Sequence, residues 1–173
     1  MKPPIFRKFD SGKLEISKYA LSRMLIFIQD ALHKQEAGGV LLGRYIRESL
    51  DIVIDEVTVP MIGDRRRKFS FFRSRRSHQK VLDKVWQETG GTSVYLGEWH
   101  THPESYPVPS RTDLKDWKRK LREDVFDGDA LYFIILGIKS LRIWEGRKSS
   151  LSCELIGELC YLGERNVKDK YSS

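Results

Sequence analysis

The chain has 173 residues, of which 40% are hydrophobic and 32% are charged, with a formal net charge of +7. This length and composition suit one folded domain with a buried core, and they exclude a wholly disordered chain. Because no run of eighteen apolar residues occurs and no apolar stretch follows the N-terminal residues 1–4, we expect neither a membrane segment nor a signal peptide, and we place the protein in the cytoplasm.

The first half of the chain predicts strands around one long helix. Apolar residues at helical spacing predict an amphipathic helix over residues 18–35, which Gly38-Gly39 ends. The basic, aromatic segment 61–76 is expected to be part loop and part edge strand. Alternating or continuously apolar runs predict strands at 13–17, 40–46 and 51–59.

The second half predicts two more helices and a Pro-rich loop at 103–109. The helices are expected at about 76–88 and 110–124, the first ending at a Gly-Gly pair. Strands are predicted at 94–100, 130–138, 141–145 and 151–162. Helices and strands alternate without a strict βαβ rhythm, so we predict an α+β fold, a mixed three-layer sandwich. We expect a single domain over residues 1–173, with 1–12 and 164–173 peripheral or flexible.

Cys153 and Cys160 are the only cysteines, and both fall in the predicted final strand. Their odd separation places them on opposite faces of a regular strand, which is poor geometry for a disulfide between them. We therefore expect two reduced thiols.

Much of the positive charge is concentrated in a few short segments. Such clusters can contact nucleic acid or acidic protein surfaces, or can form an ordinary solvated face, and charge alone does not decide between these interpretations. The clusters are Arg65-Arg66-Arg67-Lys68, Arg73 with Arg75-Arg76, and Lys118-Arg119-Lys120 with Arg122.

His100, His102 and Asp113 form the one constellation that points to metal chemistry. Two histidines at positions i and i+2 of a strand leave the same face, so both imidazoles can reach one ion. The Pro-rich loop can fold back and deliver Asp113 as a third ligand. Two imidazoles and a carboxylate suit zinc and leave the fourth position for water.

A structural role explains part of the same pattern. Ser110 and Asp113 have the form of a helix capping box, which needs no metal. Capping leaves the two histidines and the Pro-rich loop unexplained, and Ser110 can cap the helix while Asp113 faces an ion. We interpret the other histidines, His33 and His78, as structural.

Together these residues resemble the signature of the JAMM (MPN-plus) zinc peptidases. His100-Thr101-His102-Pro103, Ser110 after a seven-residue spacer between it and the second histidine, and Asp113 match that signature without insertion or deletion. The segment from Glu36 to Gly43 is similar to the family's upstream acidic segment, and the resemblance spans roughly residues 14–145. It implies an MPN-type (cytidine-deaminase-like) mixed sheet sandwiched by helices.

The resemblance also implies a role for each position. His100, His102 and Asp113 would bind one Zn²⁺ per chain, Glu36 would act as the general base, and Ser110 would donate to the oxyanion. Glu98 is a rival for the base, or a partner that orients His100, because it lies two residues before His100 on the same strand face. Trp99 and Thr101 point to the opposite face, and we expect them to be packing residues.

Within the family, the chain is most similar to compact bacterial members of CBASS antiphage operons, also described as integrative and conjugative element proteins. That likeness implies an isopeptidase acting on a protein conjugate, either of a ubiquitin-like protein or of a nucleotidyltransferase C-terminal tail, with E1/E2-like transfer enzymes as partners. The alternatives are a deubiquitinase-like peptidase of another bacterial pathway, a metal-free interaction module and a DNA-associated module. We expect no membrane partner and do not favour nucleic acid.

The segment 61–76 is a candidate surface for holding the substrate protein. Its phenylalanines can bury against a partner while its arginines meet carboxylates, although core phenylalanines and solvated arginines would give the same pattern. The candidate contacts are Arg65, Arg66, Arg73 and Arg75.

Overall fold

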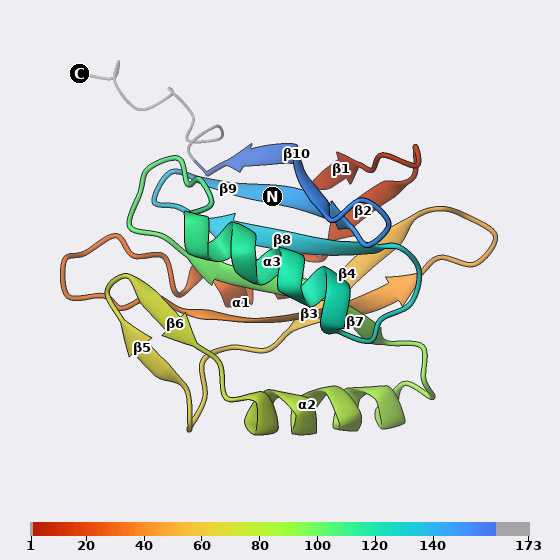
Figure 1. Ribbon diagram of the computed structural model, residues 1–173, viewed down its shortest axis with the longest axis horizontal. Helices are drawn as coiled ribbons and strands as arrows, with labels where there is room; N and C mark the ends of the chain where they lie inside the picture. Colours follow the sequence, from red (N-terminus) through yellow and green to blue (C-terminus); the bar gives the residue numbers. More distant parts are fainter. Residues whose placement is uncertain (1, 162–173) are drawn as a thin grey trace, which may run out of the picture.

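The computed structural model describes residues 2–161, in which an eight-stranded mixed sheet lies between helices (Figure 1). The helices are α1 (Lys18–Leu25), α2 (Arg75–Glu88) and α3 (Arg111–Glu123). The strands are β1 (Ile5–Arg7), β2 (Lys13–Ile16), β3 (Gly38–Tyr45), β4 (Ile52–Val57), β5 (Arg65–Arg67), β6 (Ser70–Phe72), β7 (Val94–Thr101), β8 (Ala130–Leu136), β9 (Ser140–Arg147) and β10 (Ser152–Cys160). The predicted α+β architecture is confirmed.

The large sheet has the order β1-β2-β4-β3-β7-β8-β9-β10, and β5 with β6 forms a separate two-stranded hairpin. The pairs β2/β4 and β7/β8 are parallel, and the other pairs are antiparallel. The sheet curls so strongly that its two edge strands meet: Phe6 of β1 packs on Gly157 of β10. A Cβ on Gly157 would lie 2.2 Å from the Phe6 ring, so only glycine fits there.

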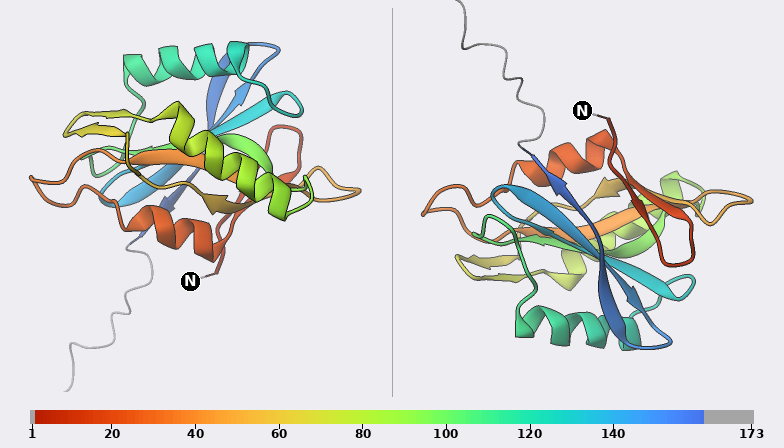
Figure 2. Two further views of the ribbon diagram at one scale, coloured as in Figure 1. Left: turned by 90° about the horizontal axis from the view of Figure 1, so that it is seen from below. Right: turned by 90° about the horizontal axis from the view of Figure 1, so that it is seen from above.

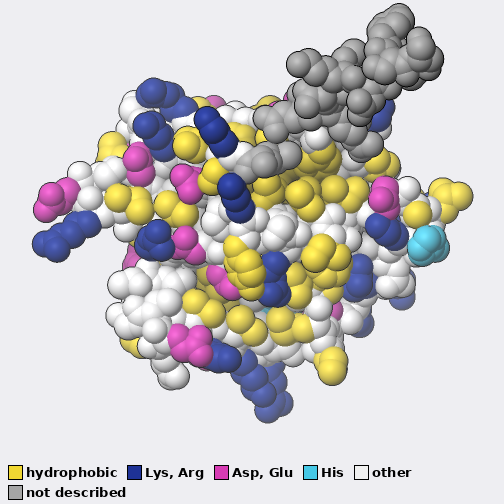
Figure 3. Space-filling model, turned by 180° about the vertical axis from the view of Figure 1, so that it is seen from behind, with side chains coloured by type: hydrophobic (Ala, Val, Ile, Leu, Met, Phe, Trp, Pro, Cys, Tyr) yellow, Lys and Arg dark blue, Asp and Glu magenta, His cyan; other side chains and the backbone are white. Residues whose placement is uncertain are grey.

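Helices α1 and α3 lie on opposite faces of the sheet (Figure 2), and each covers its own hydrophobic cluster. Ala20, Leu21 and Met24 of α1 are buried in the larger cluster. Trp117 of α3 stacks on Phe133 in the smaller cluster, with ring centroids 4.7 Å apart. Figure 3 shows the rear of the molecule, where hydrophobic side chains gather between scattered Lys and Arg.

Helix α2 packs differently from the other two helices, because His78 is its only buried residue. His78 Nε2 lies 3.0 Å from Asp64 Oδ2, and its Nδ1 lies 2.6 Å from Thr58 Oγ1. Asp64 also accepts the backbone N–H of Ser74, the N-cap of α2. His78 thus has a structural role, as the sequence predicted, and fastens the start of α2 to the end of β4.

The predicted helix over residues 18–35 is wrong beyond Leu25, where α1 ends. Its later apolar residues do not share a buried face: Ile28 packs on the core from a turn, whereas Leu32 is 87% exposed. The backbone of the loop is held by side chains, including a 3.0 Å bond from Lys34 Nζ to Ile28 O. His33 is exposed in this loop rather than on a helix.

The two cysteines are free, as predicted, but the argument from opposite faces is wrong. A bulge between Leu155 and Gly157 shifts the register of β10, so that Cys153 pairs with Gly146 and Cys160 with Ser140. Those two partners lie an even number of residues apart on a regular strand, which puts both thiols on one face.

Within residues 2–161, none of the helices has the length and apolar character that crossing a membrane requires. Residues 1–12 include the edge strand β1, and the predicted peripheral segment 164–173 lies outside the described residues.

Candidate metal centre

Strand β7 delivers His100 and His102 to one side of the sheet, as their spacing predicted. A bulge before Gly97 changes the register against β3, and Gly97 takes a φ of 137° that favours glycine. His102 follows the last residue of β7, and its N–H donates to Leu136 O over 2.9 Å, which continues the pairing with β8. The two imidazoles therefore leave an anchored strand end.

The Pro-rich loop 103–109 is fastened to the turn between β8 and β9. Ile138 N–H donates to Glu104 O over 2.7 Å, and Lys139 N–H donates to Ser105 O over 3.0 Å. These bonds return the chain to the sheet, where α3 begins at the cap residue Ser110.

The predicted capping box is present. Ser110 N–H donates to Asp113 Oδ2 over 2.6 Å, and Asp113 N–H donates to Ser110 Oγ over 3.1 Å. The same carboxylate also faces the histidines, with Oδ1 3.3 Å from His100 Nε2 and Oδ2 3.4 Å from His102 Nε2. Asp113 thus caps the helix and joins the cluster at once.

The spacing of these donors fits a tetrahedral ion. The two Nε2 atoms are 3.1 Å apart, and the carboxylate oxygens lie 3.3 and 3.4 Å from them. Zinc binds imidazole and carboxylate at roughly 2.0–2.2 Å, which places neighbouring tetrahedral donors about 3.3 Å apart. The Nε2 separation is close to this value, and each imidazole has its own Asp113 oxygen at a similar distance, so His100, His102 and Asp113 can together hold one metal ion.

Glu36 completes the cluster from the other side. Ligand atoms of Glu36, His100 and His102 all lie within 4.8 Å of one another. Glu36 is 7% exposed, and no hydrogen bond to its carboxylate occurs among residues 2–161. Glu36 therefore belongs to the same cluster of potential ligand atoms as the two histidines.

The predicted helix over residues 18–35 would put Glu36 at a helix end, and this is wrong. Glu36 lies in the loop 26–37, because α1 stops early. The glycines that follow it, Gly38 and Gly39, are closely packed by other residues of the protein. A Cβ on Gly38 would lie 2.7 Å from the Phe71 ring, and one on Gly39 would lie 2.0 Å from Thr58 O.

The two carboxyl groups of the cluster have opposite pKa shifts. Burial raises the pKa of Glu36, and the nearby histidines offset this only in part. Burial also acts to raise the pKa of Asp113, but hydrogen bonds with His100 and His102 hold it well below its usual value. Glu36 is thus suited to taking up a proton, and Asp113 to remaining an anionic ligand.

Glu98, the predicted rival of Glu36, lines the same cleft but is paired with cations. Arg73 Nη2 forms a close ion pair with Glu98 Oε1, and Lys120 Nζ lies 3.0 Å from the same oxygen. All three side chains are largely buried. The structure brings Glu36, not Glu98, into the cluster of potential ligand atoms.

The four candidate arginines of segment 61–76 fall into two pairs. Arg66 bonds internally, donating from Nε to Glu36 O over 2.9 Å and from Nη2 to Gln35 O over 3.1 Å. Arg73 is bound to Glu98. Arg65, stacked over the Phe72 ring, and Arg75 are exposed. Of the four arginines, only Arg65 and Arg75 are therefore exposed enough to contact a partner protein.

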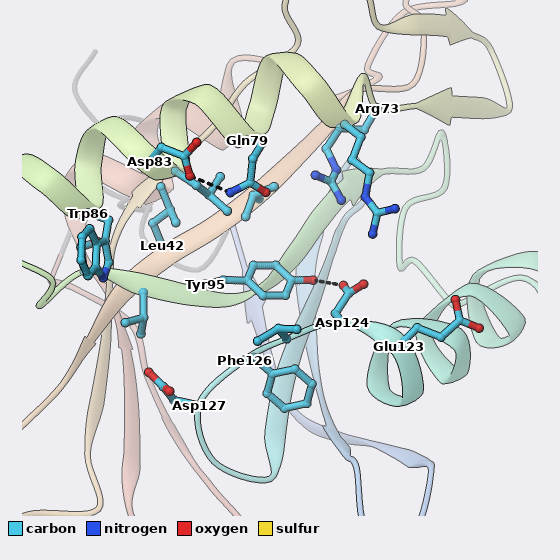
Figure 4. Close-up of a pocket in the computed structure, with 16 residues that line it drawn as sticks. Leu42, Arg73, Gln79, Asp83, Trp86, Tyr95, Glu123, Asp124, Phe126 and Asp127 are labelled. Carbon is cyan, nitrogen blue, oxygen red and sulfur yellow. Dashed lines mark hydrogen bonds between the residues drawn. The ribbon is translucent and has the colours of Figure 1, made fainter.

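The cluster opens into a cleft of about 900 Å³, which β6 lines on one side and α3 on the other. A second groove of about 470 Å³ adjoins it between α2 and residues 123–127, and Arg73, Arg75 and Asp124 line both. Figure 4 shows this groove with Arg73 at one end and Trp86 at the other, and the Tyr95 hydroxyl donating to Asp124 over 3.0 Å. No pattern in the sequence indicates this groove.

Sequence reasoning also missed two buried residues near Glu36. The predicted helix over residues 18–35 includes Gln29, and Thr101 is predicted to be a packing residue. In the structure Thr101 bonds to Ala37 and Gln29 of the loop 26–37, and Gln29 bonds to Lys68 O in the turn between β5 and β6. No spacing rule marks either residue.

Comparison with known proteins places these observations in a family. Residues 18–146 match the family of prokaryotic homologs of the JAB domain, a span that contains every residue of the cluster. A protein of Vibrio cholerae serotype O1 named CD-NTase/cGAS isopeptidase is 31% identical over 144 residues, which cover 83% of this chain and 87% of that protein. A protein of the same name from Escherichia coli (strain TW11681) is 32% identical over 140 residues, or 81% and 84% of the two chains.

A solved structure has the same fold. The solution structure of a protein from Desulfitobacterium hafniense aligns with a TM-score of 0.50 and 19% identity, covering 81% of this chain and 87% of the other. At this identity the likeness concerns the fold alone.

Proposed function

The chain belongs to the prokaryotic JAB family of JAMM-type hydrolases, and from that premise we propose that it is a zinc-dependent isopeptidase that releases the C-terminal tail of a CD-NTase from a protein conjugate. The observation that carries the proposal is the donor set, in which His100, His102 and Asp113 are spaced as neighbouring ligands of one tetrahedral ion. We propose that the reaction serves bacterial antiphage defence.

In this proposal His100, His102 and Asp113 would hold a zinc ion, which when bound would lower the pKa of its water and so supply a hydroxide-like nucleophile near neutral pH. Glu36 accepts the proton of that water and returns it to the departing amine as the C–N bond breaks. The raised pKa of Glu36 supports this role, because the carboxyl must both take up and release a proton.

We propose that Ser110 stabilises the oxyanion. Its Oγ accepts the Asp113 N–H over 3.1 Å, so the hydroxyl proton stays available to the substrate. A single donor of this kind typically contributes about 10²–10³ in rate. We assign Ser110 this hydrogen bond.

The cleft and the adjoining groove give the substrate protein two surfaces beside the metal centre. Arg75 lines the cleft and is exposed, Arg65 is exposed beside the cleft residue Phe72, and Trp86 is 56% exposed along the groove. We propose that these residues contact the body of the conjugate, while Arg66 and Arg73 maintain the site from within.

The test combines metal analysis with cleavage. Protein purified without added metal should contain about one equivalent of zinc, and it should cleave a CD-NTase joined through its C-terminal carboxyl to a reporter protein. Glu36→Gln should lower the rate by about 10²-fold or more, since it removes proton transfer, and should keep both fold and zinc.

Glu98→Gln is the matched control, because it changes a second carboxylate of the same cleft. Less than a tenth of an equivalent of zinc after metal is supplied would sink the proposal. An active Glu36→Gln with an inactive Glu98→Gln would move the base to Glu98. Cleavage of a ubiquitin-like fusion in place of the CD-NTase fusion would assign the enzyme to another conjugation pathway. Genes for E1/E2-like enzymes beside the gene of this protein would then identify that pathway.

A further inference from the structure

Two buried polar side chains, Gln29 and Thr101, lie close to the backbone that follows Glu36 and have no role in the proposed hydrolysis. Gln29 is 2% exposed and Thr101 is fully buried. Thr101 Oγ1 donates to Gln29 Oε1 over 2.9 Å and accepts the N–H of Ala37 over 3.0 Å. The N–H of Thr101 donates to Ala37 O over 2.9 Å. Both backbone polar groups of Ala37, the residue after Glu36, are therefore bonded to Thr101.

The amide group of Gln29 extends this connection to two other segments. Its Nε2 donates to Lys68 O over 3.0 Å and to Lys34 O over 3.3 Å. Gln29 thus joins β7, the loop 26–37 and the turn of the β5–β6 hairpin. Because its oxygen accepts one bond and its nitrogen donates two, its polar atoms are satisfied although they are buried.

The backbone of Glu36 is held by the hairpin on its other side. Its N–H donates to Arg67 O over 2.8 Å, and its carbonyl accepts from Arg66 Nε over 2.9 Å. Neither backbone group is free to move without breaking a bond. The position of the Glu36 carboxylate over His100 therefore depends on bonds from β5 and, through Ala37, from β7.

The place of Thr101 in β7 explains why it can act in this way. It lies between His100 and His102, so strand alternation sends its side chain to the opposite face from the imidazoles. The same strand segment thus presents the metal donors on one face and fastens the Glu36 loop from the other. An error of 1 Å in such a position can cost about 10²-fold in rate.

We propose that Thr101 and Gln29 are positioning residues, whose hydrogen bonds fix the loop 26–37 so that Glu36 stays within reach of the water beside His100 and His102. The inference rests on the proposed function of Glu36 as the base. A role in core stability alone would give a different result, because it would lower the melting temperature without a selective loss of turnover.

The test uses Thr101→Val, which keeps the shape but removes the hydroxyl, and Gln29→Met, which removes the amide. Each should lower kcat on the CD-NTase–reporter fusion by about 10- to 100-fold, with KM and the zinc content unchanged. Thr101→Ser should restore kcat to within about threefold of the wild type. Ser17→Ala, which removes the N-cap of α1 and lines neither the cleft nor the groove, is the control for general destabilisation.

A second readout does not depend on activity. In zinc-free protein, hydrogen exchange of the Ala37 amide should speed up in Thr101→Val and stay near the wild-type rate in Thr101→Ser. If Thr101→Val does not fold, Gln29→Met carries the test, because it leaves the Thr101 hydroxyl bonded to Ala37. Folded, zinc-loaded variants with kcat within twofold of the wild type would overturn the inference, as would an equal loss of kcat in Ser17→Ala. A wild type that cleaves no fusion would reject the proposed function, while the exchange rates still test the positioning.

Discussion

At the scale of single residues, Asp113 combines two tasks that can be separated by mutation. It closes the capping box of α3 with Ser110, and it faces both imidazoles. Asp113→Ala should therefore lose zinc and also lower the free energy of unfolding by about 1 kcal/mol, whereas Ser110→Ala should show the similar loss of stability and keep its zinc. Elemental analysis and thermal unfolding in the presence of a chelator check the two effects separately.

The pair of variants also shows what would contradict the assignment. A full equivalent of zinc in Asp113→Ala would remove Asp113 from the ligand set. Equal loss of zinc in both variants would mean that the helix start, and not the carboxylate itself, holds the metal.

The candidate site could be read from the sequence where its residues are close along the chain. His100, His102, Ser110 and Asp113 are related by strand alternation, a stiff loop and a helix cap, which are all local rules. Gln29 could not be found in this way, because its role depends on α1 ending at Leu25.

At the scale of elements, the β5–β6 hairpin has an exposed side and a side bonded to the Glu36 loop. The double variant Arg65→Ser/Arg75→Ser should raise KM for the CD-NTase fusion and weaken its dependence on salt, since exposed charges act mainly on association. Arg66→Ser should instead lower kcat, because it releases Glu36 O and Gln35 O. Steady-state kinetics at two salt concentrations distinguish these outcomes.

Arg7→Ser/Arg47→Ser is the matched control for the double variant. It removes the same number of exposed charges from β1 and the turn after β3, and neither residue lines the cleft. If KM rises equally in the control, the effect comes from the change in net charge and not from the hairpin. If KM is unchanged in Arg65→Ser/Arg75→Ser, these two arginines do not contact the substrate protein.

The elements themselves were predictable wherever a periodic apolar pattern coincides with burial. In β3, β7 and α3 the apolar residues of the pattern are buried in the structure, and these elements form where expected. Residues 26–35 continue the apolar spacing of α1, but their apolar side chains are not buried on one face, since Leu32 is exposed. The hairpin lies in a charged segment whose pairing follows from tertiary contacts such as Phe71 on Gly38.

At the scale of the whole molecule, a buried histidine should make stability depend on pH. Burial lowers the pKa of His78, and Asp64 raises it only in part, with Arg73 and Glu98 also facing it. The unfolded chain, with an ordinary pKa of about 6.5, therefore binds a proton more readily than the folded one. The stabilisation is complete above that pH and is lost as the pH falls through the lower, folded pKa.

Thermal unfolding at pH 7.5 and pH 5.5 checks this expectation. The wild type should lose melting temperature on acidification, and His78→Gln, which carries no titrating group there, should start lower and lose less. Parallel curves for the two proteins would show that His78 is not the source of the pH dependence. The comparison cancels the contribution of His102, whose pKa is raised by Asp113 and which both proteins share.

The distribution of the site along the chain has an evolutionary consequence. The donors and Ser110 come from residues 100–113, whereas Glu36 comes from a separate loop held by β5 and β7. On the proposed roles, metal binding and bond cleavage can therefore be lost separately. A single codon change at Glu36 would abolish cleavage and leave the three metal ligands in place, whereas loss of His100, His102 or Asp113 would remove both abilities together. A lineage of such proteins would then be able to lose catalysis first and keep the metal, but not to keep the proposed chemistry after losing a ligand from the short segment.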